Sequence, residues 1–497
     1  MQIESSIFRE YDIRGVAGVE FDPRVVAEYE KWYGAFPGVT INLETSAAIG
    51  QAYGTLIKRG GGQQVLVGHE VRPYAEQLKA AFIKGITRAG VGVTDAGSVT
   101  TPFIYWLTAH RHYDGGVNIT GSHNVYFFNG FKMMKQNSAP VYGAELQTLC
   151  QMIVNDDYDL AGEAAAVTAL PDAYQIYKNY LLSKVRLARP LRVVIDCGNG
   201  TPGLFAADLF TSLGCQVVKG LYLEPDAYFP NHVPDPESPL NMKDLMAAVK
   251  ETKADIGIAF DADGDRVGFV NETGEFVFAD EVLLLLAKDA LTRHPGKKIL
   301  FDVKCSQLLP ELIPTLGGVP LMHRTGHAPI KDTLRRDAEV ILGGEVSGHF
   351  YFVENYVKAD DGFWAAAEVL RLLAASGGSV SQMFSFIPSR VRTPEIKLPC
   401  ADTAKFAVVK AVTERFSATH DTITIDGVRV IFDSESWGLV RASNTSPYLT
   451  IRLEAPTAER ALEIKKHLAE VLDTFPEITE QLDREHVYSP TGKLGYL

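Results

Sequence analysis

The sequence predicts an α/β fold in which three similar domains of alternating strands and helices precede a smaller α+β domain. Short apolar runs typical of buried strands alternate with helical stretches over most of the chain, which favours layered α/β units. Three of these units each deliver a polar loop from the end of a strand, which suggests a repeated domain. The length of 497 residues fits three or four domains at about 150 residues each.

The first unit, predicted to span residues 1–157, ends at the polar residues 155–157. The stretch 19–43 is marked by glycine and proline and has no regular pattern, so we assign no element to it. Apolar periodicity predicts a helix over 74–89 and strands over 64–67, 91–94, 116–120 and 131–134.

The two following units repeat the alternation over residues 158–275 and 276–384. In the second unit we expect strands over 192–196, 216–219 and 256–260 and helices from Thr201 and over 242–252. In the third we expect helices over 280–293, 329–337 and 361–375 and strands over 298–303, 320–323 and 340–342. Residues 385–497 are β-rich with helices over 403–417 and 458–473, which predicts a separate α+β domain.

Composition excludes several classes of protein. The formal net charge of -13 argues against a nucleic-acid or anionic-membrane partner, while a local basic pocket for a phosphorylated metabolite stays compatible with it. Five scattered cysteines without a C-x-x-C pair suit a reducing compartment and no structural zinc. The N-terminal residues lack a signal pattern and the apolar run at 282–287 is too short to cross a bilayer, so we expect a soluble, cytoplasmic protein.

The stretch 120–132 reads T-G-S-H-N-V-Y-F-F-N-G-F-K and places Ser122 on a polar loop between two predicted strands. Because loops at strand ends carry functional residues, Ser122 is a candidate for phosphorylation chemistry. An ordinary surface turn built from Gly, Ser and Asn is an equal alternative for this loop taken alone.

Three carboxylates crowd the end of the predicted strand 256–260, at Asp261, Asp263 and Asp265. Like charges this close repel each other unless a cation lies among them, and Mg²⁺ is the usual choice where a phosphate supplies another ligand. An EF-hand is disfavoured because Arg266 stands where its glycine belongs and the flanks look like strands. The main alternative interpretation of this loop is a phosphatase with Asp261 as nucleophile. A purely structural, solvated acidic turn is the other.

Two further loops offer ligand-binding groups. Residues 344–349, G-E-V-S-G-H, present a carboxylate, a hydroxyl and an imidazole that can hydrogen-bond sugar hydroxyls. Residues 441–447, R-A-S-N-T-S-P, combine an arginine with hydroxyls and turn amides that can hold a phosphate. For either loop alone, an exposed turn is the simpler reading.

Taken together and in this order, the four loops resemble those of the α-D-phosphohexomutase superfamily, most closely its bacterial phosphomannomutase/phosphoglucomutase branch. The superfamily's phosphoserine loop T-A-S-H-N-P…N-G-x-K, metal loop D-x-D-G-D-R, sugar loop G-E-x-S-G-H and phosphate loop R-x-S-N-T-x-P all have counterparts here. Weaker counterparts surround Tyr11 and Arg14, Lys304, and His327. The resemblance covers essentially the whole chain and implies a heart-shaped molecule with a central cleft.

The resemblance also implies a reaction. A phosphorylated Ser122 gives its phosphoryl group to a hexose monophosphate, forms glucose 1,6-bisphosphate or mannose 1,6-bisphosphate, and recovers the other phosphoryl group after the intermediate turns over. Mg²⁺ is held by Asp261, Asp263, Asp265 and an oxygen of the phosphorylated Ser122. The residues implied in catalysis are Ser122, His123, Lys132, Arg14, Arg266 and His349. Those implied in substrate binding are Tyr11, Lys304, His327, Glu345, Ser347, Arg441, Ser443, Asn444 and Thr445.

Three departures from the superfamily pattern stand out. Gly121 replaces the usual alanine, Val125 replaces the usual proline, and the stretch 18–40 is longer than the usual first loop. The alternatives that remain are the phosphatase and a sensor that binds sugar phosphates without turnover. The sequence leaves open the choice among glucose, mannose and amino sugars, and whether the protein is a monomer or a homodimer. Because the intermediate must reorient, we expect the fourth domain to open and close as a lid.

Overall fold

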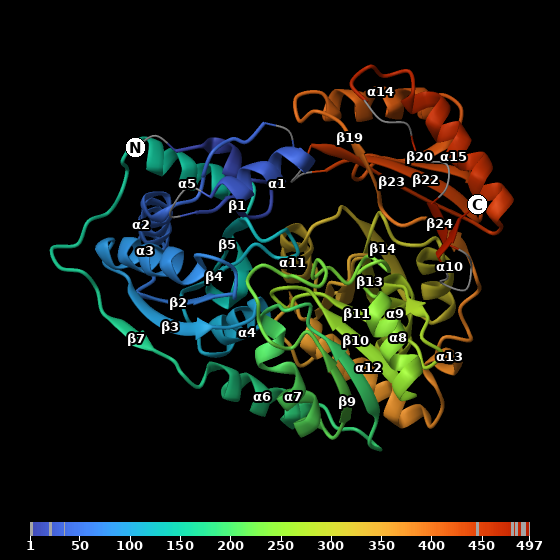
Figure 1. Ribbon diagram of the computed structural model, residues 1–497, viewed down its shortest axis with the longest axis horizontal. Coiled ribbons are helices and arrows are strands. Elements are labelled where there is room, and N and C mark those ends of the chain that lie inside the picture. Colours follow the sequence, from blue (N-terminus) through green and yellow to red (C-terminus); the bar gives the residue numbers. More distant parts are fainter. Residues whose placement is uncertain are drawn as a thin grey trace.

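The computed structural model describes residues 3–18, 22–33, 35–443, 447–478, 482, 486–488 and 494–496. Its strands form four sheets, one in each of four successive domains (Figure 1). The predicted fold class is therefore confirmed. No helix in these described segments is long and apolar enough to cross a membrane.

The first domain has a mixed sheet in the order β1-β5-β4-β2-β3-β7, with β6 paired to β5. The strands are β1 (Ile13–Val16), β2 (Gln64–His69), β3 (Gly92–Ser98), β4 (Gly115–Ile119), β5 (Phe128–Lys135), β6 (Ala139–Pro140) and β7 (Val167–Ala169). The helices are α1 (Pro23–Tyr33), α2 (Leu43–Arg59), α3 (Ala75–Arg88), α4 (Thr101–His110) and α5 (Ala144–Val154). The stretch to which we assigned no element thus contains α1, and the sheet takes β7 from beyond Asp157.

The second domain has a five-stranded sheet in the order β12-β11-β10-β8-β9. Its strands are β8 (Arg192–Asp196), β9 (Gln216–Leu221), β10 (Ile256–Phe260), β11 (Val267–Val270) and β12 (Phe276–Val277). Its helices are α6 (Ala173–Lys184), α7 (Ala206–Leu213) and α8 (Lys243–Thr252). The helix expected from Thr201 begins as a short 3-10 helix, Thr201–Leu204, before α7.

The third domain repeats this pattern in the order β14-β13-β15-β16-β17. Its strands are β13 (Lys298–Asp302), β14 (Val319–His323), β15 (Val340–Gly344), β16 (Phe350–Phe352) and β17 (Ala359–Asp360). Its helices are α9 (Ala279–Arg293), α10 (Leu308–Thr315), α11 (His327–Arg336), α12 (Gly362–Ser376) and α13 (Val380–Met383). Asp361 caps α12, because its carboxylate accepts a hydrogen bond from the backbone N–H of Trp364.

One topological feature recurs in the first three domains and places the site. A buried parallel strand, β4, β10 or β15, is followed by a polar loop and then by an antiparallel neighbour, β5, β11 or β16. The serine loop, the aspartate loop and the G-E-V-S-G-H loop occupy these three equivalent turns. Each of these loops therefore leaves the carboxyl end of a central strand, where α/β proteins bind their ligands.

The fourth domain has a separate sheet in the order β20-β21-β22-β23-β18-β24-β25, with β19 paired to β23. Its strands are β18 (Val391–Arg392), β19 (Ile396–Pro399), β20 (Asp421–Ile423), β21 (Val428–Asp433), β22 (Ser436–Ala442), β23 (Tyr448–Ala455), β24 (His486–Tyr488) and β25 (Leu494–Tyr496). Helices α14 (Lys405–Ser417) and α15 (Ala458–Leu472) pack against it. In Figure 1 this domain, in red, stands apart from the green and yellow body.

The hydrophobic core explains this separation. One continuous apolar cluster joins the first three domains, and within it the ring of Phe103 lies 4.4 Å from Tyr177 and 5.6 Å from Phe363. The fourth domain has its own cluster, built around Val430, Ile451 and Leu468 among others. Its contacts with the third domain include buried ion pairs such as Arg392 Nη1 to Asp280 Oδ1 at 2.8 Å.

Candidate active site

Loops of all four domains line one cleft. Every site residue that the sequence predicts and the structure describes is part of this cleft or of the carboxylate triad at its base. The cleft is lined by Tyr11, Arg14, Ser122, His123, Lys132, Arg266, Lys304, His327, Glu345, Ser347, His349, Arg441 and Ser443. Asn444 and Thr445 lie outside the described residues.

Ser122 is buried and has a φ of 52°, in the left-handed region that side chains other than glycine rarely adopt. Its backbone N–H donates to Thr120 Oγ1 at 2.8 Å. Its hydroxyl oxygen lies 3.3 Å from Lys132 Nζ and 3.4 Å from His123 Nδ1. The unusual backbone conformation is imposed by the surroundings of the loop, and it directs the hydroxyl into the cleft.

Lys132 connects the serine to the aspartates. Its strand, β5, pairs antiparallel with β4, which brings Lys132 opposite Asn118 and back beside the serine loop. Its Nζ donates to Asp263 Oδ2 at 2.9 Å and also to Asp265 Oδ2. Although burial opposes the charge, these carboxylates raise the pKa of Lys132 above its ordinary value.

Asp261, Asp263 and Asp265 are fully buried, and oxygens of all three lie within 4.8 Å of one another. Burial and repulsion from the other two carboxylates raise the pKa of Asp261 well above its ordinary value. Asp261 Oδ2 and Asp263 Oδ1 have no hydrogen-bond partner among the described residues. Converging oxygens that lack a proton donor are suitable ligands for a hard divalent cation, so the triad fits Mg²⁺.

Arg266 follows the triad and faces the cleft. Its backbone N–H donates to Asp261 Oδ1 at 3.0 Å, and its guanidinium lies 3.4 Å from Asp235 and 3.7 Å from Glu237. An isolated β-bridge joins Arg266 to His349. The aspartate loop and the G-E-V-S-G-H loop are therefore fixed to each other across the boundary between the second and third domains.

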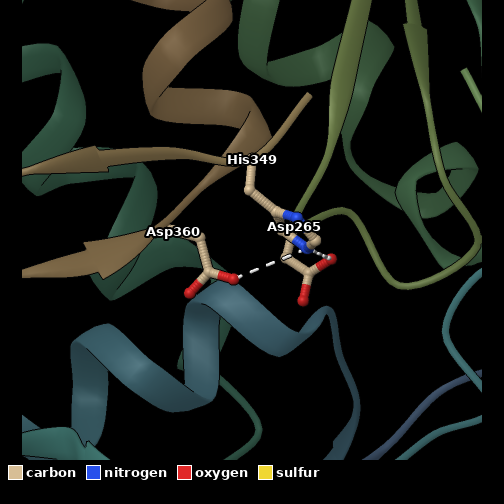
Figure 2. Close-up of side chains that lie close together, drawn as sticks. All are labelled: Asp265, His349 and Asp360. Atoms are coloured by element: carbon tan, nitrogen blue, oxygen red, sulfur yellow. Dashed lines mark ion pairs between the residues drawn. The ribbon is translucent and has the colours of Figure 1, made fainter. Parts of the chain in front are cut away.

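His349 lies among carboxylates, as Figure 2 shows for Asp265 and Asp360. Its Nε2 is 3.3 Å from Asp265 Oδ1 and 3.7 Å from Asp360 Oδ2, and its Nδ1 is 3.2 Å from Glu345 Oε2. Burial opposes its charge, but Asp265 and Glu345 raise the pKa of His349 to about 9. Asp360 is itself paired with Lys331 Nζ at 2.9 Å. These carboxylates therefore favour the charged form of His349 beside the triad.

The third domain supplies further polar groups. Glu345 Oε1 accepts from the backbone N–H of Gly326 at 2.8 Å, and Ser347 Oγ lies 2.9 Å from His349 Nδ1. Both ring nitrogens of His327 are buried and lack a hydrogen-bond partner within the described part of the chain. Tyr11 reaches this region from the first domain, because its hydroxyl donates to the carbonyl of Thr325 at 2.7 Å.

Several cations also line the cleft. Arg441 in β22 is held by Asp426 at 3.1 Å and still faces the cleft. Lys304 Nζ lies 3.8 Å from both Glu237 and Glu395. On the side of the serine loop, Arg14 donates to Asp12 and to the carbonyl of Thr120.

Sequence reasoning missed several lining residues. Asp235, Glu237, Glu395, Lys397 and Tyr448 all face the cleft. Asp235 and Glu237 lie on the proline-rich loop before α8, Glu395 directly precedes β19, Lys397 lies in β19, and Tyr448 begins β23. No sequence pattern marked these positions as functional. Burial raises the pKa of Glu237 to about 7, although Lys304 opposes the rise.

A serine hydroxyl beside a carboxylate triad, in a cleft lined by arginine, lysine and histidine, defines a phosphoryl-transfer enzyme. Residues 28–159, 174–274 and 278–390 match alpha/beta/alpha domains I, II and III of phosphoglucomutase/phosphomannomutase, and residues 395–471 match its C-terminal domain. The chain belongs to the phosphoglucomutase/phosphomannomutase family.

Individual relatives agree along nearly the whole chain. A phosphomannomutase/phosphoglucomutase of Pseudomonas putida is 40% identical over 464 residues, or 93% of this chain and 94% of the relative. A phosphoglucomutase of Neisseria gonorrhoeae is 36% identical over 479 residues, or 96% and 98%. The crystal structure of a family protein from Burkholderia thailandensis matches with a TM-score of 0.84 at 34% identity, covering 97% of this chain and all of that one.

Proposed function

We propose that this protein is a phosphohexomutase that interconverts hexose 1-phosphates and hexose 6-phosphates through a phosphorylated Ser122 and a hexose 1,6-bisphosphate. The observation that carries the proposal is the contact between Ser122 Oγ and Lys132 Nζ at 3.3 Å, because the same ammonium group pairs with Asp263 and Asp265. A phosphoryl group on Ser122 would therefore lie close to both the Lys132 ammonium group and the carboxylates that would bind the metal. The rival phosphatase with Asp261 as nucleophile leaves this arrangement of Ser122 without a role.

Asp261, Asp263 and Asp265 would hold Mg²⁺ together with an oxygen of the phosphorylated Ser122. When bound, the ion neutralises charge on the phosphoryl group that is transferred. Lys132 would stabilise the same charge and handle the proton of the reacting hydroxyl, with Arg14 and His349 as further cations. Arg266, which lines the cleft, would face the transferring group, and His123 lies beside the serine. Phosphoryl transfer needs this positioning and charge neutralisation more than covalent activation.

The sugar and the second phosphate would lie on the other walls of the cleft. Glu345 and Ser347 would grip sugar hydroxyls, with Lys304, His327 and Tyr11 near the same ring. The ring nitrogens of His327 are buried and have no hydrogen-bond partner among the residues that the structure describes, which supports a role in hydrogen bonding to substrate. Arg441 and Ser443, with Asn444 and Thr445 of the same loop, would hold the phosphate that does not react in each half cycle.

Reorientation of the bisphosphate would require the cleft to open. The separate core of the fourth domain supports a lid motion, because this domain can move without exposing the shared core of the other three. The five cysteines are all free and buried, which supports residence in the reducing cytoplasm.

A direct assay tests the proposal. The purified protein with Mg²⁺ and a trace of glucose 1,6-bisphosphate should convert glucose 1-phosphate and mannose 1-phosphate into the 6-phosphates. The names of the relatives from Pseudomonas and Neisseria support these two sugars. Turnover of glucosamine 1-phosphate, without turnover of the other two sugars, would change the proposed substrate to an amino sugar. Release of inorganic phosphate without isomerisation would favour the phosphatase.

A further inference from the structure

We propose that Arg72, paired with Glu70, is a positioning residue that clamps the serine loop from beneath and aims Ser122 into the cleft. The role of Arg72 in holding the loop is independent of the proposed function. Only the role in orienting Ser122 for catalysis rests on that function. Neither residue was among the candidate site residues, and neither lines the cleft.

The guanidinium of Arg72 donates hydrogen bonds to four backbone carbonyl groups of the loop. Its Nη1 donates to the carbonyls of Val125 at 2.6 Å and Phe128 at 3.2 Å. Its Nη2 donates to the carbonyls of Ser122 and Asn124. One planar cation thus binds acceptors on both sides of the turn, which a lysine ammonium cannot span in the same geometry.

Glu70 completes the clamp. Its Oε1 accepts from Arg72 Nε at 2.7 Å, from Thr120 Oγ1 at 2.9 Å and from the backbone N–H of Gly121. The side chains of Glu70 and Arg72 are both 0% exposed, so each charge depends on the other and on the loop for its hydrogen bonds. The clamp also touches the second domain, because the Arg72 guanidinium lies 4.9 Å from the ring of Phe229.

Two features of the serine loop indicate that contacts from outside the loop hold its conformation. Ser122 holds a φ of 52°, which persists in a non-glycine residue only where the surroundings determine it. Gly121 replaces the alanine usual in the superfamily, and a Cβ at this position would lie 2.5 Å from Arg72 Nε and 2.4 Å from the carbonyl oxygen of Phe128. The missing side chain therefore lets the guanidinium approach the loop closely.

The test combines hydrogen exchange of the serine loop with steady-state kinetics on the full chain. The variants are Arg72→Lys, which keeps the charge and removes the fork, and Gly121→Ala, which adds one methyl group against the guanidinium. Arg88→Lys, an exposed arginine at the end of α3, is the matched control. Gly121 does not use a positive φ, so alanine is compatible with its backbone dihedral angles, but its Cβ must displace both the guanidinium and the Phe128 carbonyl. The unfolding temperature of each variant therefore checks that it is folded before its exchange and kinetics are compared with wild type.

In both clamp variants, the amides of residues 121–128 should exchange about tenfold faster than in wild type, because hydrogen bonds from a charged donor are lost. The turnover number should fall by roughly ten- to a hundredfold while the Michaelis constant stays within about threefold. Arg88→Lys should match wild type in both measurements.

Unchanged loop exchange in the variants would overturn the clamp. Faster exchange with an unchanged turnover number, or a loss that falls on the Michaelis constant, would overturn its role in aiming Ser122. If wild-type protein has no mutase activity, the proposed function fails, and loop exchange still decides whether Arg72 holds the loop.

Discussion

Lys132 Nζ lies 2.9 Å from Asp263 Oδ2 and 3.3 Å from Ser122 Oγ, so a single ammonium group bridges Ser122 and the carboxylate triad. The bridge spans two domains, since Ser122 lies in the turn between β4 and β5, Lys132 lies within β5, and Asp263 follows β10. In the proposed reaction, it would place a buried cation where negative charge develops as a phosphoryl group moves to or from Ser122.

Replacing Lys132 by alanine should therefore act mainly on the chemical step. We expect the turnover number to fall by roughly a hundredfold or more, with a much smaller change in the Michaelis constant. Lys135→Ala, three pairings further along β5 at a partly exposed ion pair with Glu145, should leave both constants near wild type. Steady-state kinetics with glucose 1-phosphate measure the difference. A Lys132→Ala variant that binds weakly but turns over normally would contradict this assignment.

The carboxylate triad should make stability depend on magnesium. Because Asp261 is buried beside two like charges, Asp261→Asn should unfold at a temperature about 2 °C or more above wild type when both are in chelator. Magnesium should raise the unfolding temperature of wild type but have little effect on the variant, which should also lose activity. Asp244→Asn, on the exposed side of α8, is the control. An Asp261→Asn variant less stable than wild type in chelator would argue against repulsion within the triad.

Arg441 should serve binding rather than chemistry. It lies on the fourth domain, where a phosphate that does not react in the half cycle would be held. Removing a charge-assisted contact of about 1.5–3 kcal/mol should raise the Michaelis constant of Arg441→Ala roughly 10- to 100-fold and change turnover little. Arg460→Ala, in the same domain but paired with Asp433 at the surface, should behave like wild type. A loss that appears mainly in turnover would place Arg441 at the reacting centre instead.

Glu237 should make stability depend on pH. Burial raises the pKa of Glu237 to about 7. The positive charge of Lys304 lowers this pKa, and the negative charge of Glu395 raises it further. The folded protein then keeps a proton that the unfolded chain releases near pH 4.5, so wild type loses stability relative to Glu237→Gln as the pH rises to 7.

The unfolding temperature of Glu237→Gln minus that of wild type should therefore increase between pH 5 and pH 8 and stay constant above. Glu339→Gln, an exposed glutamate of the third domain, should show no such trend. A difference that is flat or that falls with pH would show that Glu237 is charged in the folded protein throughout this range.

Residues of all four loops named from the sequence line one cleft in the structure. These loops could be found in the sequence because each is a run of consecutive polar residues after an apolar strand. The equivalence of the turns after β4, β10 and β15 follows from the same alternation. Glu70 and Arg72 escaped prediction because their partners lie about 50 residues away, and many of these are backbone carbonyls that carry no sequence pattern. Their role appears only once β2 and β4 are side by side in the sheet.

Other omissions have different physical causes. Helix α4 is buried on nearly all sides, so it lacks the alternation of apolar and polar faces that marked the other helices. Helix α1 occupies the long first loop, and the ring of its Tyr29 lies 5.9 Å from that of Phe127, so its position depends on tertiary contacts. Glu237 and Glu395 come together across a domain boundary, which no local pattern can encode.

The central claim is that Ser122 carries the phosphoryl group, and locating a transferred phosphate tests it most directly. Wild type and Ser122→Ala should each be incubated with Mg²⁺ and glucose 1,6-bisphosphate, and the phosphorylated residue identified by peptide mass spectrometry. The account predicts an acid-stable phosphate on Ser122 in wild type, and no phosphorylation and almost no mutase activity in Ser122→Ala. Phosphate on Asp261, or near-normal turnover by Ser122→Ala, would contradict it.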